Sequence, residues 1–157
     1  MATTATSQAL PGADEPPVRL RASEVMTADV ATVTPTTTVG EAMTSMRTLG
    51  VRHLPVIGDG RFVGIVDDRL VALALLTAGG VVEALEQPVS TAITHYVPQV
   101  APGESLQRVA HLLSTSRCDA IVVIDAQEHL LGIITMVDIV NAVARGDVPV
   151  TAAGARS

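Results

Sequence analysis

Residues 131–140 read LGIITMVDIV, a pattern typical of a buried strand that runs directly into a helix. The β-branched residues before Thr135 predict the strand, and the helical spacing of Val137 and Val140 predicts the helix. The first turn of such a helix presents free backbone N–H groups beside the Thr135 hydroxyl, and together these groups suit a phosphate. Asp138 lies one turn further on, where its carboxylate can accept hydrogen bonds from ribose hydroxyls. This stretch therefore predicts a nucleotide site.

A second interpretation of the same residues needs no ligand. A Thr followed three residues later by an acid, before an apolar run, is also an ordinary helix N-terminus. Thr135 would then cap the helix, and the helix dipole would favour Asp138 in the first turn. Both interpretations stay open at this point.

The composition excludes several classes of function. The net charge is −6 and all ten basic residues are Arg, so the surface offers no basic stripe for nucleic acid. One Phe, one Tyr and no Trp leave no aromatic platform for stacking bases. The single Cys118 cannot form an internal disulfide, and no cluster of Cys and His predicts a metal site.

Targeting and membrane signals are also missing from the sequence. The longest uncharged run, from Leu70 to Val82, is too short to span a bilayer. The N-terminus has no basic segment followed by an apolar run, as a signal peptide would have. We therefore expect a soluble, cytoplasmic protein with no membrane association.

Short elements with clear boundaries fill the middle of the chain. Residues 1–17 are rich in Thr, Ala, Ser, Gly and Pro and are predicted to form a disordered N-terminal tail, and residues 147–157 a C-terminal tail. The predicted elements are a helical turn at 22–26, a strand at 30–34, a helix at 39–49 behind the capping box Thr38–Glu41, strands at 53–57 and 62–66 around a turn at 58–60, and a helix at 68–77.

The same order of elements then recurs. A shift of about 67 residues places Pro35 on Pro102 and Leu54 on Ile121, and a shift of 68 places Gly64 on Gly132. Neither repeat alone has enough layers to cover its small sheet. We therefore expect a mixed α/β (α+β) fold of two pseudo-symmetric strand-helix-hairpin-helix repeats, at residues 18–82 and 83–146, packed face to face.

Both repeats carry motifs that resemble a known family. The motifs are GVRHLPVI at 50–57 and GIV at 64–66 in the first repeat, and IVVID at 121–125 and GIITMVDI at 132–139 in the second. This doubled pattern, over residues 21–145, resembles the tandem CBS (cystathionine β-synthase) domain pair, also called a Bateman module. Each motif is weakly specific alone, whereas their doubled occurrence at this spacing is strong.

The resemblance implies a nucleotide-binding site in the cleft between the repeats. It assigns Thr135 to phosphate and Asp138 to ribose, and it places adenine against backbone and apolar side chains of two strands. The positions that match the adenine contacts are Tyr96, Val97, Ala120 and Ile121.

Two further candidates, Arg52 and His53, stand where family members often present basic side chains to phosphate. A guanidinium can hold phosphate through two hydrogen bonds, and an imidazole would add pH dependence near neutrality. The alternative is that Arg52 is a solvated surface charge and His53 a partly buried filler.

The first repeat departs from this pattern. Asp67 stands where the second repeat has Thr135, and Leu70 stands where it has Asp138. Asp67 and Asp68 would repel phosphate at close range. We therefore expect at most one nucleotide per chain, with the equivalent site either empty or open to uncharged or cationic groups.

These features predict a regulatory binding module and no enzyme, because the sequence shows no convergent set of catalytic residues. The resemblance implies that the ligand is AMP, ADP, ATP or S-adenosylmethionine, as in energy sensing, and that no cofactor is required. The alternative is a vestigial pair with a purely structural or protein-interaction role. Wide apolar faces on the helices at 70–76 and 137–143 predict a homodimer, and regulation would act on an unidentified target protein.

Overall fold

The computed structural model of the chain describes residues 20–77, 79–116 and 118–147. Its elements are α1 (Ala22–Val25), α2 (Val39–Leu49), β1 (His53–Gly58), β2 (Arg61–Asp67), α3 (Asp68–Thr77), α4 (Val81–Glu86), a 3-10 turn η1 (Val89–Thr91), β3 (Gln99–Val100), α5 (Leu106–Thr115), β4 (Ala120–Ile124), β5 (Leu130–Thr135) and α6 (Met136–Ala144). The predicted tails at 1–17 and 147–157 lie outside the described residues, except for Asp147.

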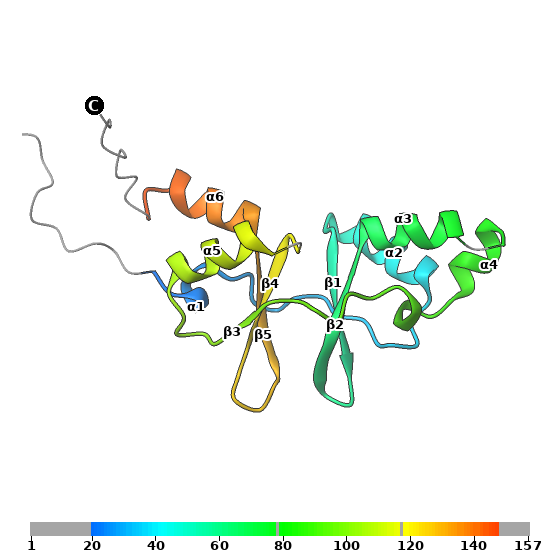
Figure 1. Ribbon diagram of the computed structural model, residues 1–157, viewed down its shortest axis with the longest axis horizontal. Helices are drawn as coiled ribbons and strands as arrows, with labels where there is room; N and C mark the ends of the chain where they lie inside the picture. Colours follow the sequence, from blue (N-terminus) through cyan, green and yellow to red (C-terminus); the bar gives the residue numbers. More distant parts are fainter. Residues whose placement is uncertain (1–19, 78, 117, 148–157) are drawn as a thin grey trace, which may run out of the picture.

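The fold consists of two halves that are each built on a β-hairpin (Figure 1). In the first half, helices α2, α3 and α4 lie beside β1 and β2; in the second, α1, α5 and α6 lie beside β4 and β5. The two hairpins have equivalent registers, because Leu54 pairs with Val66 in one and Ile121 pairs with Ile134 in the other. The predicted mixed fold of two similar repeats is confirmed.

Local sequence signals set the boundaries of α2. Thr38 accepts a hydrogen bond from the Glu41 N–H at 3.2 Å, and the Glu41 carboxylate accepts one from the Thr38 N–H at 2.8 Å. This is the predicted capping box, which satisfies N–H groups that the helix itself cannot. The helix ends at Gly50, which takes a left-handed conformation with φ 67° that suits glycine.

The predicted strand at 30–34 is wrong, because only Val33 pairs there, through one parallel bridge to Val56. The equivalent segment of the second half forms β3, where the Val122 N–H donates to the Pro98 carbonyl at 3.1 Å. The residue equivalent to Val122 is Pro55, which has no N–H to donate. One proline therefore shortens the pairing in the first half.

Helix α4 was not predicted from the sequence. It follows Gly80, is six residues long and packs against α2. A Cβ on Gly40 would lie only 3.2 Å from the Leu85 carbonyl oxygen, so the two helices approach closely. Six residues give too few turns for a helical period to be recognised.

The two repeats exchange the segments with which they begin. In the second half, the Ala22 N–H donates to the Glu104 carbonyl at 2.8 Å, so α1 packs against the second repeat. In the first half, the Val89 N–H donates to the Thr37 carbonyl at 2.8 Å, so η1 packs against the first repeat. The boundaries 18–82 and 83–146 thus divide the sequence, whereas each half in space combines parts of both ranges.

Each exchanged segment crosses a hairpin at a glycine. Thr27 bridges to Ile133 in β5, and Thr94 bridges to Ile65 in β2. A Cβ on Gly132 would lie 2.7 Å from the Thr27 carbonyl oxygen, and a Cβ on Gly64 would lie 2.6 Å from that of Thr94. Only glycine admits these crossings without moving the backbone.

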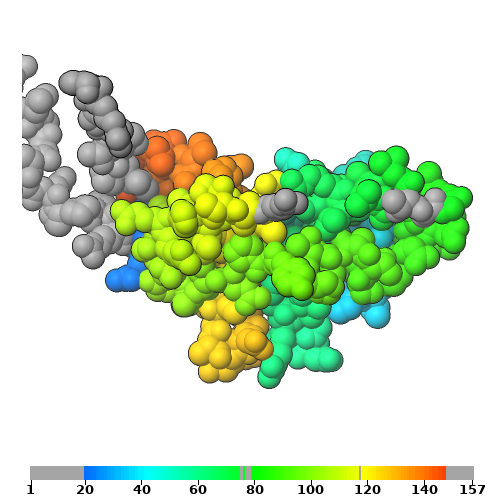
Figure 2. Space-filling model, in the orientation of Figure 1, coloured from blue at the N-terminus to red at the C-terminus, as the bar shows by residue number. Residues whose placement is uncertain are grey.

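The halves meet face to face through a separate apolar core. Ile65 from the first repeat packs with buried residues of the second, namely Val97, Ala120, Val122 and Ile133. Beyond this core the two hairpin turns project from the same edge of the molecule (Figure 2). There Arg61 and Glu128 form an exposed ion pair at 3.0 Å between the halves. This confirms the predicted face-to-face packing.

Candidate functional site

A cavity of about 600 Å³ lies between the halves, beside the start of α6. Its volume falls within the range of small-molecule sites, which is roughly 300–1,000 Å³. Three segments form its walls: the chain before α2 (Thr27, Asp29, Val30, Ala31), the link from α2 to β1 (Leu49, Gly50, Val51, Arg52, His53) and the β5–α6 junction (Ile133, Thr135, Met136, Val137, Asp138), with Asp119 beside them. The large cavity therefore combines apolar walls with a small number of polar groups.

The Asp138 carboxylate is turned back onto the start of α6. One of its oxygens accepts hydrogen bonds from the Thr135 N–H and the Thr135 hydroxyl, each at 2.7 Å. Its other oxygen lies 3.5 Å from the Thr27 hydroxyl, a longer contact from the crossing segment. Asp138 therefore makes the hydrogen bonds of a helix cap while lining the large cavity, so neither interpretation of this pair excludes the other.

Arg52 and His53 line the large cavity opposite that junction. Arg52 is exposed and its Nε donates to Asp68 at 2.8 Å, a hydrogen bond that raises the pKa of the guanidinium and lowers that of the carboxyl. Burial lowers the pKa of His53, and the nearby carboxylates of Asp67 and Asp119 oppose this effect. At pH 7 His53 is accordingly a neutral group, and Arg52 is the cation on this side of the cavity.

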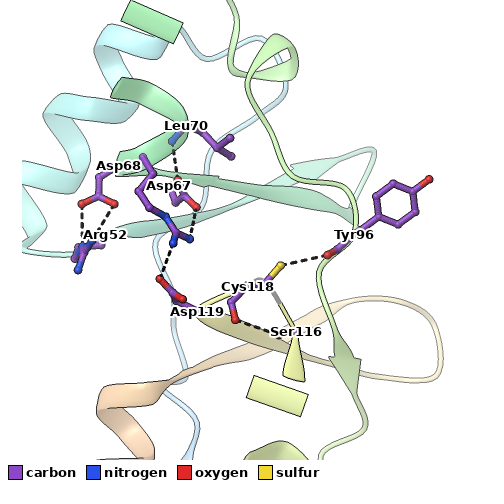
Figure 3. Close-up of polar contacts among 9 residues, drawn as sticks. Arg52, Asp67, Asp68, Leu70, Tyr96, Ser116, Cys118 and Asp119 are labelled. Atoms are coloured by element: carbon purple, nitrogen blue, oxygen red, sulfur yellow. Dashed lines mark hydrogen bonds and ion pairs between the residues drawn. The ribbon is translucent and has the colours of Figure 1, made fainter. Parts of the chain in front are cut away.

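A smaller cavity of about 230 Å³ occupies the equivalent place in the other half. Asp67, at the start of α3, is 7% exposed and accepts a hydrogen bond from the Leu70 N–H at 2.8 Å. The Arg69 guanidinium lies 3.4 Å from the Asp67 carboxylate and 3.1 Å from that of Asp119. In Figure 3, Asp67 and Asp119 face each other across this space from opposite halves. The small cavity is thus lined by two carboxylates and one guanidinium.

The eight predicted site residues do not share one cavity. Thr135, Asp138, Arg52 and His53 line the large cavity, whereas Tyr96, Val97 and Ala120 line the small one together with His53. Ile121 lines neither cavity, because its side chain is fully buried in the core of the second half. The Tyr96 side chain is 94% exposed and points away from Cys118 and Asp119 in Figure 3.

Exchange of the repeat-initial segments explains this division. The segment before β3 crosses to β2, so Tyr96 and Val97 complete the small cavity beside Asp67. The segment before α2 crosses to β5, so Val30 and its neighbours complete the large cavity beside Thr135. Sequence reasoning missed Thr27, Asp29, Val30 and Ala31. A shift of 67 residues would have identified two of them as the counterparts of Tyr96 and Val97.

Two kinds of site have no support within the described residues. No group of three or more His, Cys, Asp or Glu side chains among residues 20–77, 79–116 and 118–147 is placed to hold a metal ion. Over the same ranges, no helix is long and apolar enough to cross a membrane.

Comparison with known proteins identifies the family. The model of the CBS domain matches this chain twice, at residues 22–77 and 89–145. The chain belongs to the CBS domain family. One matched segment lies in each of the two repeats, so the predicted tandem CBS pair is confirmed.

Relatives of this CBS pair include the inosine-5′-monophosphate dehydrogenase of Methanocaldococcus jannaschii. The two sequences are 31% identical over 122 residues, which cover 77% of this chain and 23% of that enzyme. The chain thus spans less than a quarter of the length of this relative.

Solved CBS structures have the same fold. The CBSX2 structure in complex with AMP gives a TM-score of 0.70 at 26% identity, covering 80% of this chain and 96% of that one. The CBS pair of protein MJ0100, in complex with 5′-methylthioadenosine and S-adenosyl-L-methionine, gives 0.73 at 20% identity, covering 82% and 98%.

Proposed function

We propose that this CBS pair is a regulatory module that binds one adenosine-containing ligand in the large cavity. The observation that carries the proposal is that Thr135 and Asp138 line the same cavity as apolar residues of the crossing segment. Two similar structures contain AMP or S-adenosylmethionine, which supports the same ligand class. We further propose that the occupied module acts on another protein and catalyses no reaction itself.

Each part of the ligand has a matching wall in the large cavity. Val30, Ala31 and Ile133 offer apolar surface to adenine, and the Asp138 carboxylate is the acceptor for ribose hydroxyls. The Thr135 hydroxyl and Arg52 lie where a 5′ substituent would lie, and a phosphate there would compete with Asp68 for the guanidinium. The ligand would replace hydrogen bonds that Asp138 now makes to Thr135.

Those existing hydrogen bonds also support a second candidate function. Asp138 is already satisfied by Thr135 without any ligand. A pair whose cavities have lost their ligand would keep this cap and act only as a structural or interaction module. The two candidates differ in whether adenosine compounds bind the folded chain.

The decisive experiment is calorimetric titration of the chain with AMP, ATP, S-adenosylmethionine and 5′-methylthioadenosine. Binding of one of them is expected, and Asp138→Ala should weaken it about tenfold or more, since a hydrogen bond to a charged group is worth roughly 1.5–3 kcal/mol. Binding of none of the four would contradict the proposal and favour the structural role.

A matched control separates binding from capping. Glu41 caps α2 as Asp138 caps α6, because its carboxylate accepts from both the Thr38 N–H and the Thr38 hydroxyl. Glu41→Ala removes a cap of the same kind far from the large cavity. We expect it to leave affinity unchanged; an equal loss of affinity in both variants would show that capping alone explains the effect of Asp138→Ala.

We also propose that two copies associate through the outer faces of α3 and α6. Four large apolar side chains of these helices are exposed outside the large cavity, namely Leu73, Leu76, Val140 and Val143. Val140→Glu should convert a dimer to a monomer in sedimentation equilibrium, whereas Gln107→Glu on the exposed face of α5 should not. A monomeric parent protein at micromolar concentration would contradict this proposal.

A further inference from the structure

Arg69 occupies a central position in the small cavity. Its guanidinium lies within 3.4 Å of the Asp67 carboxylate and 3.1 Å of the Asp119 carboxylate. Asp67 belongs to the first half and Asp119 to the second, so one side chain bridges the halves. Asp67 is 93% buried, and its carboxylate contacts this guanidinium and accepts a hydrogen bond from the Leu70 N–H.

The equivalent residues of the large cavity lack such a bridge. Arg69 corresponds to Val137, whose side chain is 65% exposed and carries no charge. Asp67 corresponds to Thr135 and Leu70 to Asp138. At these three positions the large cavity has a hydroxyl, an apolar side chain and a carboxylate. The small cavity has a carboxylate, a guanidinium and an apolar side chain in the same order.

We propose that Arg69 is a built-in occupant of the small cavity, which closes it to nucleotides and leaves the chain with one ligand site. The guanidinium holds the space between the two carboxylates that a ligand would otherwise enter, and the remaining volume of about 230 Å³ falls below the roughly 300 Å³ of small-molecule sites. Leu70 provides no acceptor for ribose. The number of ligands per chain rests on the function proposed above, whereas the role of Arg69 as occupant does not.

The first test installs the missing site. In the triple variant Asp67→Thr, Arg69→Val and Leu70→Asp, the small cavity acquires the residues of the large one. Titration with AMP, and in parallel with uncharged adenosine, which Asp119 does not repel, should give one ligand per parent chain and two per variant chain. A parent that binds two ligands, or a variant that stays at one with an unchanged melting temperature, would overturn the inference.

The second test needs no nucleotide and applies even if the triple variant does not fold. Arg69→Ala should lower the melting temperature by about 4 °C, because two carboxylates lose their shared cation. Methylguanidinium at 10 mM should restore at least half of this loss by taking the place of the side chain. Sodium at the same ionic strength should not.

Arg61→Ala is the matched control for this rescue. The Arg61–Glu128 pair also joins the halves, but both of its side chains are more than 60% exposed and it lies outside both cavities. Methylguanidinium should leave the melting temperature of Arg61→Ala unchanged. Equal effects on the two variants, or no rescue of Arg69→Ala, would overturn the role of Arg69 as occupant. A parent that binds no adenosine compound would contradict only the proposed function.

Discussion

The two cavities of this CBS pair come from the same repeated pattern but differ in size and charge. The large one, at about 600 Å³, has Thr135 and Asp138 at a helix start, and the small one, at about 230 Å³, has Asp67 and Leu70 in their places. An Asp caps both helix starts, but it stands at a different position in each. Asp138 caps from the third helical position, whereas Asp67 precedes the helix. Pseudo-symmetry of the backbone therefore coexists with cavities of different size and charge.

The substitutions with the largest expected effect test whether the two halves unfold as one cooperative unit. Leu54 and Ile121 are equivalent and almost fully buried, so Leu54→Ala and Ile121→Ala should each cost about 3 kcal/mol in the free energy of unfolding. Because the exchanged segments tie the halves together, urea should produce one transition that both variants shift. Gln107→Ala, at an exposed position of α5 outside the proposed dimer surface, is the control. Two transitions, with one shifted in each variant, would show independent halves.

Substitutions of the two glycines at which the exchanged segments cross test the two cavities separately. Gly132→Ala and Gly64→Ala each force a Cβ against a backbone oxygen, which should cost about 2 kcal/mol in denaturation experiments. Gly132→Ala should also weaken ligand binding, since it displaces Thr27 at the wall of the large cavity. Gly64→Ala should not weaken it. Gly103→Ala, with open space around its Cβ, should change neither property.

The pH dependence of stability tests the contribution of His53, whose counterpart in the other repeat is Ala120. Burial lowers the pKa of His53 in the folded state, so the unfolded chain binds more protons below about pH 6.5. The free energy of unfolding should therefore fall as the pH drops from about 7 to 5. Asp68 and Asp125, whose pKa values are lowered by hydrogen bonds from Arg52 and His129, contribute only at lower pH.

His53→Ala makes this position match the second repeat. The variant should be less stable at pH 7, but the slope of its stability between pH 7 and pH 5 should be smaller. Chemical denaturation at several pH values measures this slope. An unchanged slope would mean that other groups titrate in this range.

The smallest expected effect concerns the exposed bridge between the hairpin turns. Arg61→Ala removes the ion pair with Glu128, and solvent screening limits the loss to no more than about 1 kcal/mol. Added salt should reduce the difference from the parent protein. We expect Arg69→Ala to lose more stability than Arg61→Ala in the same denaturation assay, because the Arg69 bridge is partly buried. The opposite order would contradict this expectation.

The sequence predicted most elements and one side of the candidate site. The capping box at Thr38, the stop at Gly50 and the Thr135–Asp138 junction depend on residues within a few positions of each other, so local rules identify them. The strand predicted at 30–34 does not form, because Pro55 in the neighbouring strand β1 has no N–H to donate to it. Tyr96, Val97 and Ala120, which the sequence grouped with Thr135 and Asp138, line the small cavity instead, because their placement depends on which repeat each segment crosses.

By itself, the sequence determined the repeat, the family and the polar residues that distinguish the two halves, because periodicity, turns and caps are encoded locally. Only the tertiary structure decided which segment completes which cavity and which charges meet. Arg69 and Asp119 are 50 positions apart and come from different repeats, so no local pattern predicts their ion pair. Their contact results from the crossing of chains at Gly64 and Gly132, which brings the two halves face to face.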